Sequence, residues 1–274
     1  MRVALIGDVG GHRELLERSL TSLGASPADG TLPDDLVVVQ LGDLVDRGPD
    51  SAGCVAVADR FLAGGSGRWV QLLGNHEGNR LGGPRFWDED IGAQAEQTLQ
   101  SWWAQRRAGM AVAIRCAELG DVLVSHGGLV PSLWEILGRP ASHQAAGLLN
   151  SWVGSRPELA FAAGELLTGH GGGFCGPAWA SAGTELYGAW ADAPFVPFSQ
   201  VHGHSSVCAW PSGRLLSTVG RVRWVAVVDT EHRRVQVALG DRTFTGIDPC
   251  LSDVPGGASI SALVLHGEIV AAHR

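Results

Sequence analysis

The sequence predicts an α/β fold in which parallel strands are connected by helices. Short apolar runs at 2–6, 36–41 and 69–73 are each followed directly by glycine, as expected where a strand ends. The segments between them, 12–23 and 51–63, carry apolar residues at helical spacing. This alternation is typical of βαβ units with crossover connections, because parallel neighbours cannot be joined by a tight turn.

The early elements each carry a local signal. Leucines recur at helical spacing over 12–23, and Gly24 supplies the helix stop. The run at 36–41, LVVVQL, is almost wholly apolar, as expected for a strand buried on both faces. Further on, DVLVS at 121–125 is predicted to be a strand that ends at His126.

The later part of the chain divides into helical and strand-rich stretches. A tryptophan-rich stretch from about 85 to 110 is predicted to be helical, and residues 131–195 are predicted to be mainly helical. Strand is predicted over 198–210, and β-like runs continue from 215 as LLSTV, RWVAVV, RRVQVAL and ISALVL. Because no linker divides the chain, we expect residues 1–274 to form a single domain, with 131–195 as a helical cap over the site.

The composition bounds the class of protein. Hydrophobic residues make up 45% of the sequence, which is enough for a substantial core. The formal net charge of −8 argues against a nucleic-acid partner, and no apolar run reaches the roughly 20 residues of a membrane span. The five cysteines are scattered without a CxxC pair, and MRVALIGD has no signal-peptide pattern, so we expect reduced thiols and a cytoplasmic location.

Polar side chains follow three of the predicted strands at the point where each strand stops. The three segments are GDVGG at 7–11, GDLVDRG at 42–48 and GNHE at 74–77. Because the carboxyl ends of parallel strands meet at one edge of a sheet, we expect these side chains to converge there. Oxygen and nitrogen donors of this kind bind divalent metal ions, so the sequence predicts a metal site at this edge.

A hydrolytic site with two metal ions needs a bridging carboxylate and terminal oxygen and nitrogen ligands. Asp43, at the end of the second strand, suits the bridge. His202 and His204 lie two residues apart in VHGHS, so on a strand both would point to one face. The predicted ligands all lie at strand ends: Asp8, Asp43, Asn75, His126, His202 and His204.

Three further residues fit the chemistry of phosphate-ester hydrolysis. Arg47 is placed to hold the phosphate oxygens in a fork. His76 is the predicted proton donor to the leaving group, with Asp46 fixing its tautomer. A metal-bound hydroxide would attack phosphorus in line, because a bound metal lowers the pKa of water to around 7. Manganese, iron or zinc suits this mixed set of ligands.

The order and spacing of these segments resemble the calcineurin-like metallophosphoesterase superfamily, and within it the phosphoprotein-phosphatase-type branch. The branch pattern continues here with HGG at 126–128 and GHS at 203–205. GIDPC at 246–250, with GG at 256–257, is similar to its closing segment. The resemblance implies a four-layer sandwich of two mixed β-sheets flanked by helices, with two divalent metal ions at the strand ends.

The sequence departs from this family pattern in two places. Gly10 stands where the family has a metal-binding histidine, so the first metal is completed by His12, by His202 or His204, or is bound weakly. Of these we favour the VHGH segment, because both its histidines lie within reach of the site. GPAWAS at 176–181 has the tryptophan but lacks the phosphate-clamping arginine that the branch often has there, which leaves the class of substrate open.

We therefore expect a metal-dependent phosphoesterase that hydrolyses a phosphomonoester, on a small metabolite or on the serine or threonine of a phosphoprotein. Two alternatives stay open. One is a nucleotide polyphosphate hydrolase, and the other is a degenerate, non-catalytic member that binds a phosphorylated ligand or partner protein. In each case the expected partner is phosphorylated, and neither nucleic acid nor membrane is expected.

Overall fold

The computed structural model describes residues 1–170, 174–251 and 260–273, and a ten-stranded hydrogen-bonded ladder runs through these residues. Its strands follow one another in the order β3-β2-β1-β12-β4-β5-β6-β11-β10-β9. Their bounds are β1 Arg2–Ile6, β2 Leu36–Gln40, β3 Trp69–Gln71, β4 Ala111–Cys116, β5 Gly120–Ser125, β6 Ser199–His202, β9 Ala226–Asp229, β10 Arg234–Leu239, β11 Arg242–Gly246 and β12 Leu263–Ala271. A separate two-stranded ribbon pairs β7 (Cys208–Ala209) with β8 (Arg214–Leu215).

The parallel βαβ units predicted for the first part of the chain are confirmed. β1 pairs with β2 and β2 pairs with β3, all parallel, through the helices α1 (Arg13–Ser22) and α2 (Ser51–Ala63). Leu16 and Leu20 of α1 lie in the same buried cluster as Ala4 and Ile6 of β1. This apolar stripe at helical spacing fixes which face of the sheet α1 covers.

The long strand β12 connects the two halves of the sheet. Its first part pairs antiparallel with β1, with Leu263 opposite Leu5, and its second part pairs antiparallel with β4, with Gly267 opposite Cys116. A side chain at residue 267 would collide with the backbone carbonyl of Arg115, so only glycine permits this change of partner.

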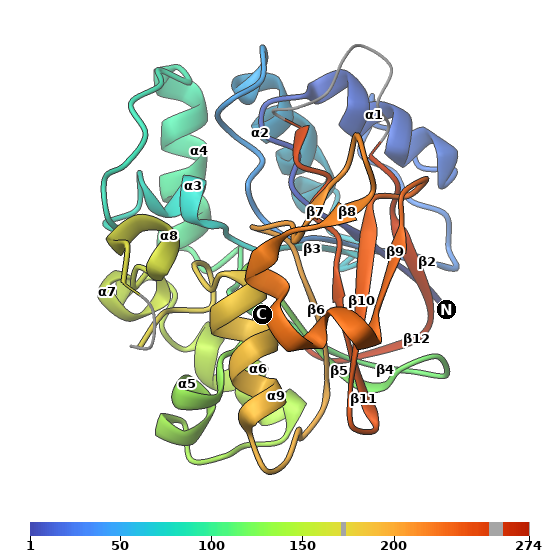
Figure 1. Cartoon of the computed structure of the whole chain (residues 1–274). Helices are drawn as coiled ribbons and strands as arrows, with labels where there is room; N and C mark the ends of the chain where they lie inside the picture. The colour runs from blue at the N-terminus through green and yellow to red at the C-terminus, as the bar shows by residue number, and fades with distance from the viewer. Residues whose placement is uncertain (171–173, 252–259, 274) are drawn as a thin grey trace.

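The two halves of the ladder pack face to face as two layers. One buried cluster joins Val3 and Leu5 of β1 to Val112 and Ile114 of β4. The outer faces carry helices, with α1 and α2 (blue) together at the top of Figure 1 and α5, α6 and α9 at its lower left. The α/β architecture of mixed sheets flanked by helices is thereby confirmed, although the two sheets are layers of one ladder.

Other elements differ from the sequence-based prediction. The helix expected from about 85 begins only at Ala93 (α4, Ala93–Ala104). The strand expected over 198–210 is interrupted after His202 and resumes only in β7, because His204 adopts a left-handed φ of 63° that an extended strand cannot contain. LLSTV and the start of RWVAVV lie mainly in the 3₁₀ helix η2 (Ser217–Val225) instead of a strand. The strands β4 and β11 were not predicted.

The predicted helical region 131–195 contains six helices among the described residues. They are α5 Pro131–Ile136, α6 Ser142–Asn150, α7 Pro157–Ala160, α8 Glu165–Thr168, the π-helix η1 Ala182–Gly188 and α9 Ala189–Asp192. α6 packs on β4, β5 and β12, whereas α8 lies beside the cavity described below. None of the described helices is both long and apolar enough to cross a bilayer.

Replacing Gly267 with alanine is expected to lower the free energy of unfolding by about 1–3 kcal/mol, because the new Cβ overlaps the Arg115 carbonyl at the crossing point of the sheet. Urea unfolding measures the change. Gly147→Ala in α6 is the matched control, because its Cβ meets no atom within 4 Å and alanine favours helix. Equal unfolding midpoints for the two variants would contradict this account of β12.

Candidate active site

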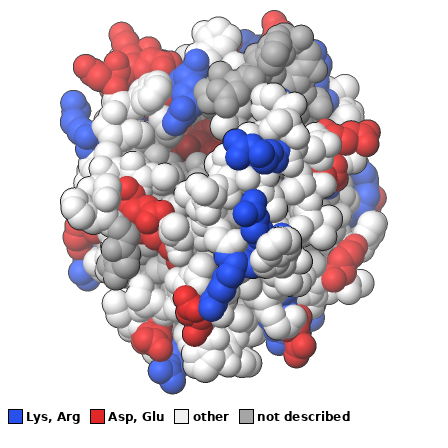
Figure 2. All heavy atoms as spheres, in the orientation of Figure 1, with Lys and Arg blue, Asp and Glu red and all other residues white. Residues whose placement is uncertain are grey.

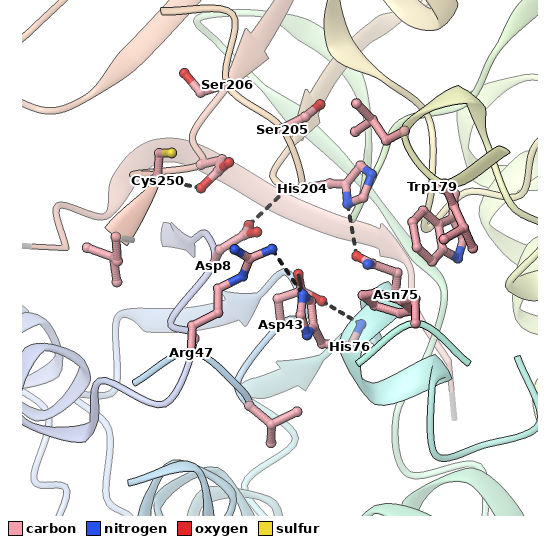
Figure 3. Close-up of a pocket in the computed structure, with 17 residues that line it drawn as sticks. Asp8, Asp43, Arg47, Asn75, His76, Trp179, His204, Ser205, Ser206 and Cys250 are labelled. Atoms are coloured by element: carbon pink, nitrogen blue, oxygen red, sulfur yellow. Dashed lines mark hydrogen bonds and ion pairs between the residues drawn. The ribbon is translucent and has the colours of Figure 1, made fainter. Parts of the chain in front are cut away.

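The predicted strand-end side chains gather at one edge of the sheet. Asp8 follows β1, Asp43 follows β2, and Asn75 and His76 begin the short helix α3 (Asn75–Gly78) just after β3. His126 follows β5. Figure 3 shows Asp8, Asp43, Asn75, His76 and His204 pointing toward a common centre. The segments therefore converge as predicted, at the ends of β1, β2, β3, β5 and β6. The roles of the residues remain predictions.

The loop after β2 has an unusual backbone that other groups hold in place. Asp43, Asp46 and Arg47 all have left-handed φ values of 52°, 72° and 69°. Such conformations are disfavoured for residues other than glycine and persist only where the surroundings hold them. Glu77 does this at Asp43, because its buried carboxylate accepts hydrogen bonds at 2.8 Å from the backbone N–H groups of Asp43, Leu44 and Gly74. The backbone N–H groups of Asp46 and Arg47 donate instead to Ser51 and Glu89.

Sequence reasoning gave Glu77 no role, although it stands within the GNHE segment. Replacing it with glutamine leaves one acceptor oxygen for three buried N–H donors, and an unpaired buried donor costs about 1–3 kcal/mol. We expect Glu77→Gln to lower the free energy of unfolding by this amount and to weaken metal binding through Asp43. Urea unfolding and metal analysis test this, with Glu135→Gln on the exposed face of α5 as control. Unchanged values in both measurements would refute it.

Four donors converge in a way that suits a divalent cation. Asp43, His126 and His204 each offer a ligand atom within 4.8 Å of the others. His126 Nε2 and His204 Nδ1 both approach the Asn75 Oδ1 atom, at 3.0 and 2.9 Å. The His126 Nδ1 atom lies 3.0 Å from the Leu41 carbonyl, which accepts its proton. In the neutral ring Nε2 then keeps its lone pair, so these residues fit a metal ion of the Mn, Fe or Zn type.

The carboxylates of the cluster repel one another and attract the His126 ring. Burial raises the pKa of Asp8 well above its ordinary value, and the nearby Asp248 and Asp43 carboxylates raise it further. Burial lowers the pKa of His126, but Asp43 and Asp8 outweigh this and raise it to about 10. Burial alone would raise the pKa of Asp43, but the nearby His126 and His76 hold this pKa below its usual range. A divalent cation would relieve the repulsion among these carboxylates.

Asp248 was missed by sequence reasoning, although it lies within GIDPC. It is buried, lines the same cavity as Asp8 and Asp43, and accepts a hydrogen bond from the Cys250 N–H at 2.7 Å. Burial, aided by Asp43, raises its pKa. The closing segment GG at 256–257 lies outside the described residues. The signal that could have identified Asp248 is its position in the lining of the cavity. That position depends on how distant strands pair, which no local sequence pattern reveals.

His76 is held in place by Asp46, which forms a buried ion pair with Arg80. Its Nδ1 atom lies 2.6 Å from Asp46 Oδ2, and Asp46 also receives two hydrogen bonds from Arg80, at 2.7 and 3.0 Å. Asp46 therefore fixes the Nδ1–H tautomer and leaves Nε2 directed to the cavity, 4.0 Å from Asp43 Oδ2. Arg80, which sequence reasoning missed, forms an ion pair with Asp46, donating to Oδ1 and sharing Oδ2 with the His76 ring.

Arg47 reaches into the same space. Its Nη2 atom lies 3.4 Å from His76 Nε2, and its guanidinium stacks over the Trp87 ring with the central carbon 4.9 Å from the ring centroid. Its backbone N–H donates to Glu89 at 3.0 Å. Among the side chains that the structure describes, no carboxylate forms an ion pair with this guanidinium. It is therefore free to bind an anion in the cavity.

Two other predicted residues are not brought into this group. His202 Nε2 lies 2.7 Å from the Tyr187 hydroxyl and its Nδ1 lies 2.9 Å from the Gly203 carbonyl, so both ring nitrogens have partners. Burial lowers the pKa of His202 to about 4. Because β6 ends here, His202 and His204 do not share a face, and the ligand role of His202 stays a prediction. His12 precedes α1 and is absent from the described residues that line the cavity.

The position of the missing histidine is now defined. Gly10 lines the cavity with φ of 49°, and a Cβ there would meet its nearest atom, the Asp46 carbonyl oxygen, at 3.5 Å. Space for a side chain therefore exists, and only the left-handed backbone disfavours one.

The cavity in front of these residues measures about 310 Å³. Its polar side is formed by Asp8, Asp43, Asn75, His76, Arg47 and His204, and its apolar side by Phe86, Leu166, Leu167 and Trp179. On the face seen in Figure 2, acidic atoms (red) lie in a recess with basic side chains (blue) near its rim. The arrangement combines cation ligands, a free guanidinium and an oriented imidazole, which is the set that phosphate-ester hydrolysis requires.

Comparison with known proteins gives matches of two kinds. The family model of calcineurin-like phosphoesterases matches residues 1–214. Two curated proteins named "Bis(5'-nucleosyl)-tetraphosphatase, symmetrical", from Acidovorax ebreus (strain TPSY) and Acidovorax sp. (strain JS42), are each 32% identical over 181 residues. These matches cover 58% of this chain and 58% of each relative, so the chain matches little more than half their length.

Solved structures show the same fold. The cold-active protein-tyrosine phosphatase of a psychrophile Shewanella species aligns with a TM-score of 0.55 at 18% identity, over 97% of this chain and 75% of that chain. Another structure of a cold-active protein tyrosine phosphatase aligns with a TM-score of 0.56, also at 18% identity, over 97% and 73%.

Proposed function

This chain belongs to the calcineurin-like phosphoesterase family, and on that premise we propose that it is a metal-dependent hydrolase of nucleotide polyphosphates. The observation that carries the substrate class is its similarity to two symmetrical bis(5'-nucleosyl)-tetraphosphatases at 32% identity. The cavity supports it, because polar groups suited to phosphate and apolar side chains suited to an uncharged group line the same space and adjoin each other.

We assign one metal ion to Asp43, Asn75, His126 and His204, whose donor atoms converge. We assign a second ion to Asp8 and Asp43. Asp248 is a further carboxylate in the same cavity, where Gly10 offers no side chain to the ion. Such ions supply Lewis acidity toward phosphate oxygens and make a coordinated water more acidic.

The protein's own groups do the remaining work. Arg47 binds the phosphoryl oxygens, and the Trp87 ring restricts its guanidinium to the cavity. His76, oriented through Nδ1 by Asp46, carries a second proton on Nε2 in its imidazolium form and gives that proton to the leaving oxygen. The second candidate function is phosphomonoester hydrolysis. It is favoured by the fact that Arg47 is the single arginine among the described residues lining the cavity, enough for one phosphate group.

The test uses the purified protein, freed of metal by a chelator and reloaded in turn with Mn²⁺, Fe²⁺ or Zn²⁺. Metal content is measured together with the products formed from bis(5'-adenosyl) tetraphosphate and from p-nitrophenyl phosphate. Two molecules of ADP per tetraphosphate support the proposal, whereas phosphate release from the monoester alone supports the second candidate. Turnover of neither substrate with one metal equivalent or none would identify a non-catalytic binding protein and overturn both.

A further inference from the structure

One side of the cavity has no role in the phosphate chemistry proposed above. Phe86, Leu166, Leu167 and Trp179, here called the apolar wall, come from three separate parts of the chain and line the same cavity as Asp43 and Arg47. Hydrolysis at the polar groups does not require an apolar surface beside them. The apolar wall therefore indicates a substrate that carries an apolar group next to its phosphate.

The inner half of the apolar wall packs against the groups assigned to metal binding and catalysis. Trp179 is buried and packs edge-on to Phe86, with ring centroids 4.8 Å apart. Trp179 also lies 5.5 Å from the His204 ring, and Phe86 lies 4.9 Å from the His76 ring. An apolar group held here would therefore sit directly beside the reacting phosphate.

The outer half of the apolar wall is exposed to solvent. Leu166 and Leu167 are 57% and 38% exposed, and α8, which carries them, buries none of its residues. Nevertheless α8 is anchored. The largely buried Glu185 carboxylate accepts hydrogen bonds from the N–H groups of Glu165, at 3.0 Å, and Ser181, at 2.8 Å. Gly164, before α8, approaches the Trp179 carbonyl so closely that a side chain would collide with it. The two leucines are thus presented at a fixed place on the rim without being part of the core.

We propose that the apolar wall binds the nucleobase of a nucleotide substrate, and that Leu166 and Leu167 set the preference for nucleoside-bearing substrates over bare phosphate chains. This inference rests on the proposed function and specifies its substrate. A base is planar and apolar on its faces, so it can lie against aromatic edges and leucine side chains while its phosphates reach Arg47.

The experiment compares two substrates with the same phosphoanhydride chemistry, bis(5'-adenosyl) tetraphosphate and inorganic tripolyphosphate. In the double variant Leu166→Ser, Leu167→Ser we expect KM for the nucleoside substrate to rise about tenfold, from lost apolar burial, with kcat nearly unchanged. KM for tripolyphosphate is expected to stay as in the unmodified protein. Leu148→Ser is the control, because Leu148 on α6 is 41% exposed and lies outside the described lining of the cavity.

Equal effects on the two substrates, or no effect on either, would overturn the inference. A binding measurement separates its failure from that of the proposed function. Calorimetry on the metal-loaded protein compares ADP with pyrophosphate, and we expect ADP to bind more tightly in the unmodified protein but not in the double variant. Absence of turnover with this binding pattern intact would sink the proposed function alone, whereas equal affinity for the two ligands in the unmodified protein would sink the inference.

Discussion

Replacement of Asp43 with asparagine is expected to release metal and to reduce kcat on the order of a thousandfold. Asp43 lies 3.3 Å from His126 Nε2 and accepts a hydrogen bond from the His76 N–H at 3.0 Å, so its carboxylate stands at the centre of the donor set. An amide has nearly the same shape but carries no charge. It therefore cannot offset two cations, while the backbone around it is kept.

Metal analysis and steady-state kinetics measure the effect of Asp43→Asn. Asp34→Asn is the matched control, because the Asp34 side chain is fully exposed and pairs only with Arg68 among the described side chains. Retention of two metal equivalents and a normal rate in Asp43→Asn would rule out the bridging role.

The second large effect is expected at His76. The His76→Asn variant should hydrolyse phenyl phosphate about a hundredfold or more slowly, because its phenolate leaving group requires a proton. Hydrolysis of p-nitrophenyl phosphate should suffer much less, since p-nitrophenolate leaves without protonation. The Asp46→Asn variant should show the same pattern in weaker form, because it loses the group that fixes the His76 tautomer.

Rates for the two aryl phosphates are compared in each variant, with the exposed His143→Asn on α6 as control. Losses of equal size for both substrates would show that His76 holds the structure or the metals and does not donate a proton.

The part of the fold that sequence predicted is the part whose signals are local. β1, β2 and their helices follow from apolar spacing and glycine stops within a few residues of each element. The exchange of partners along β12 depends on contacts between residues 151 or more positions apart, such as Leu5 with Leu263 and Cys116 with Gly267. No local pattern encodes such a pairing, and the central place of this strand went unseen for that reason.

The candidate site likewise divides into residues that local sequence signals identify and residues whose role depends on distant contacts. Asp8, Asp43 and Asn75 were found because strand ends converge by rule in parallel sheets. Glu77 was missed because its effect is exerted on the backbone of Asp43, 34 positions earlier. The shared face predicted for His202 and His204 failed at a single left-handed residue, which a two-residue periodicity cannot anticipate.

The position of β12 has a consequence for how the protein is made. Until residues 263–271 emerge from the ribosome, β1 and β4 each expose an unpaired edge, because β12 supplies the neighbour to both. Unpaired edges invite association with other nascent chains. Synthesis therefore passes through an interval in which most of the polypeptide exists but the hydrogen-bonded ladder is broken between β1 and β4, and premature termination just before residue 263 should yield aggregates in place of a smaller folded product.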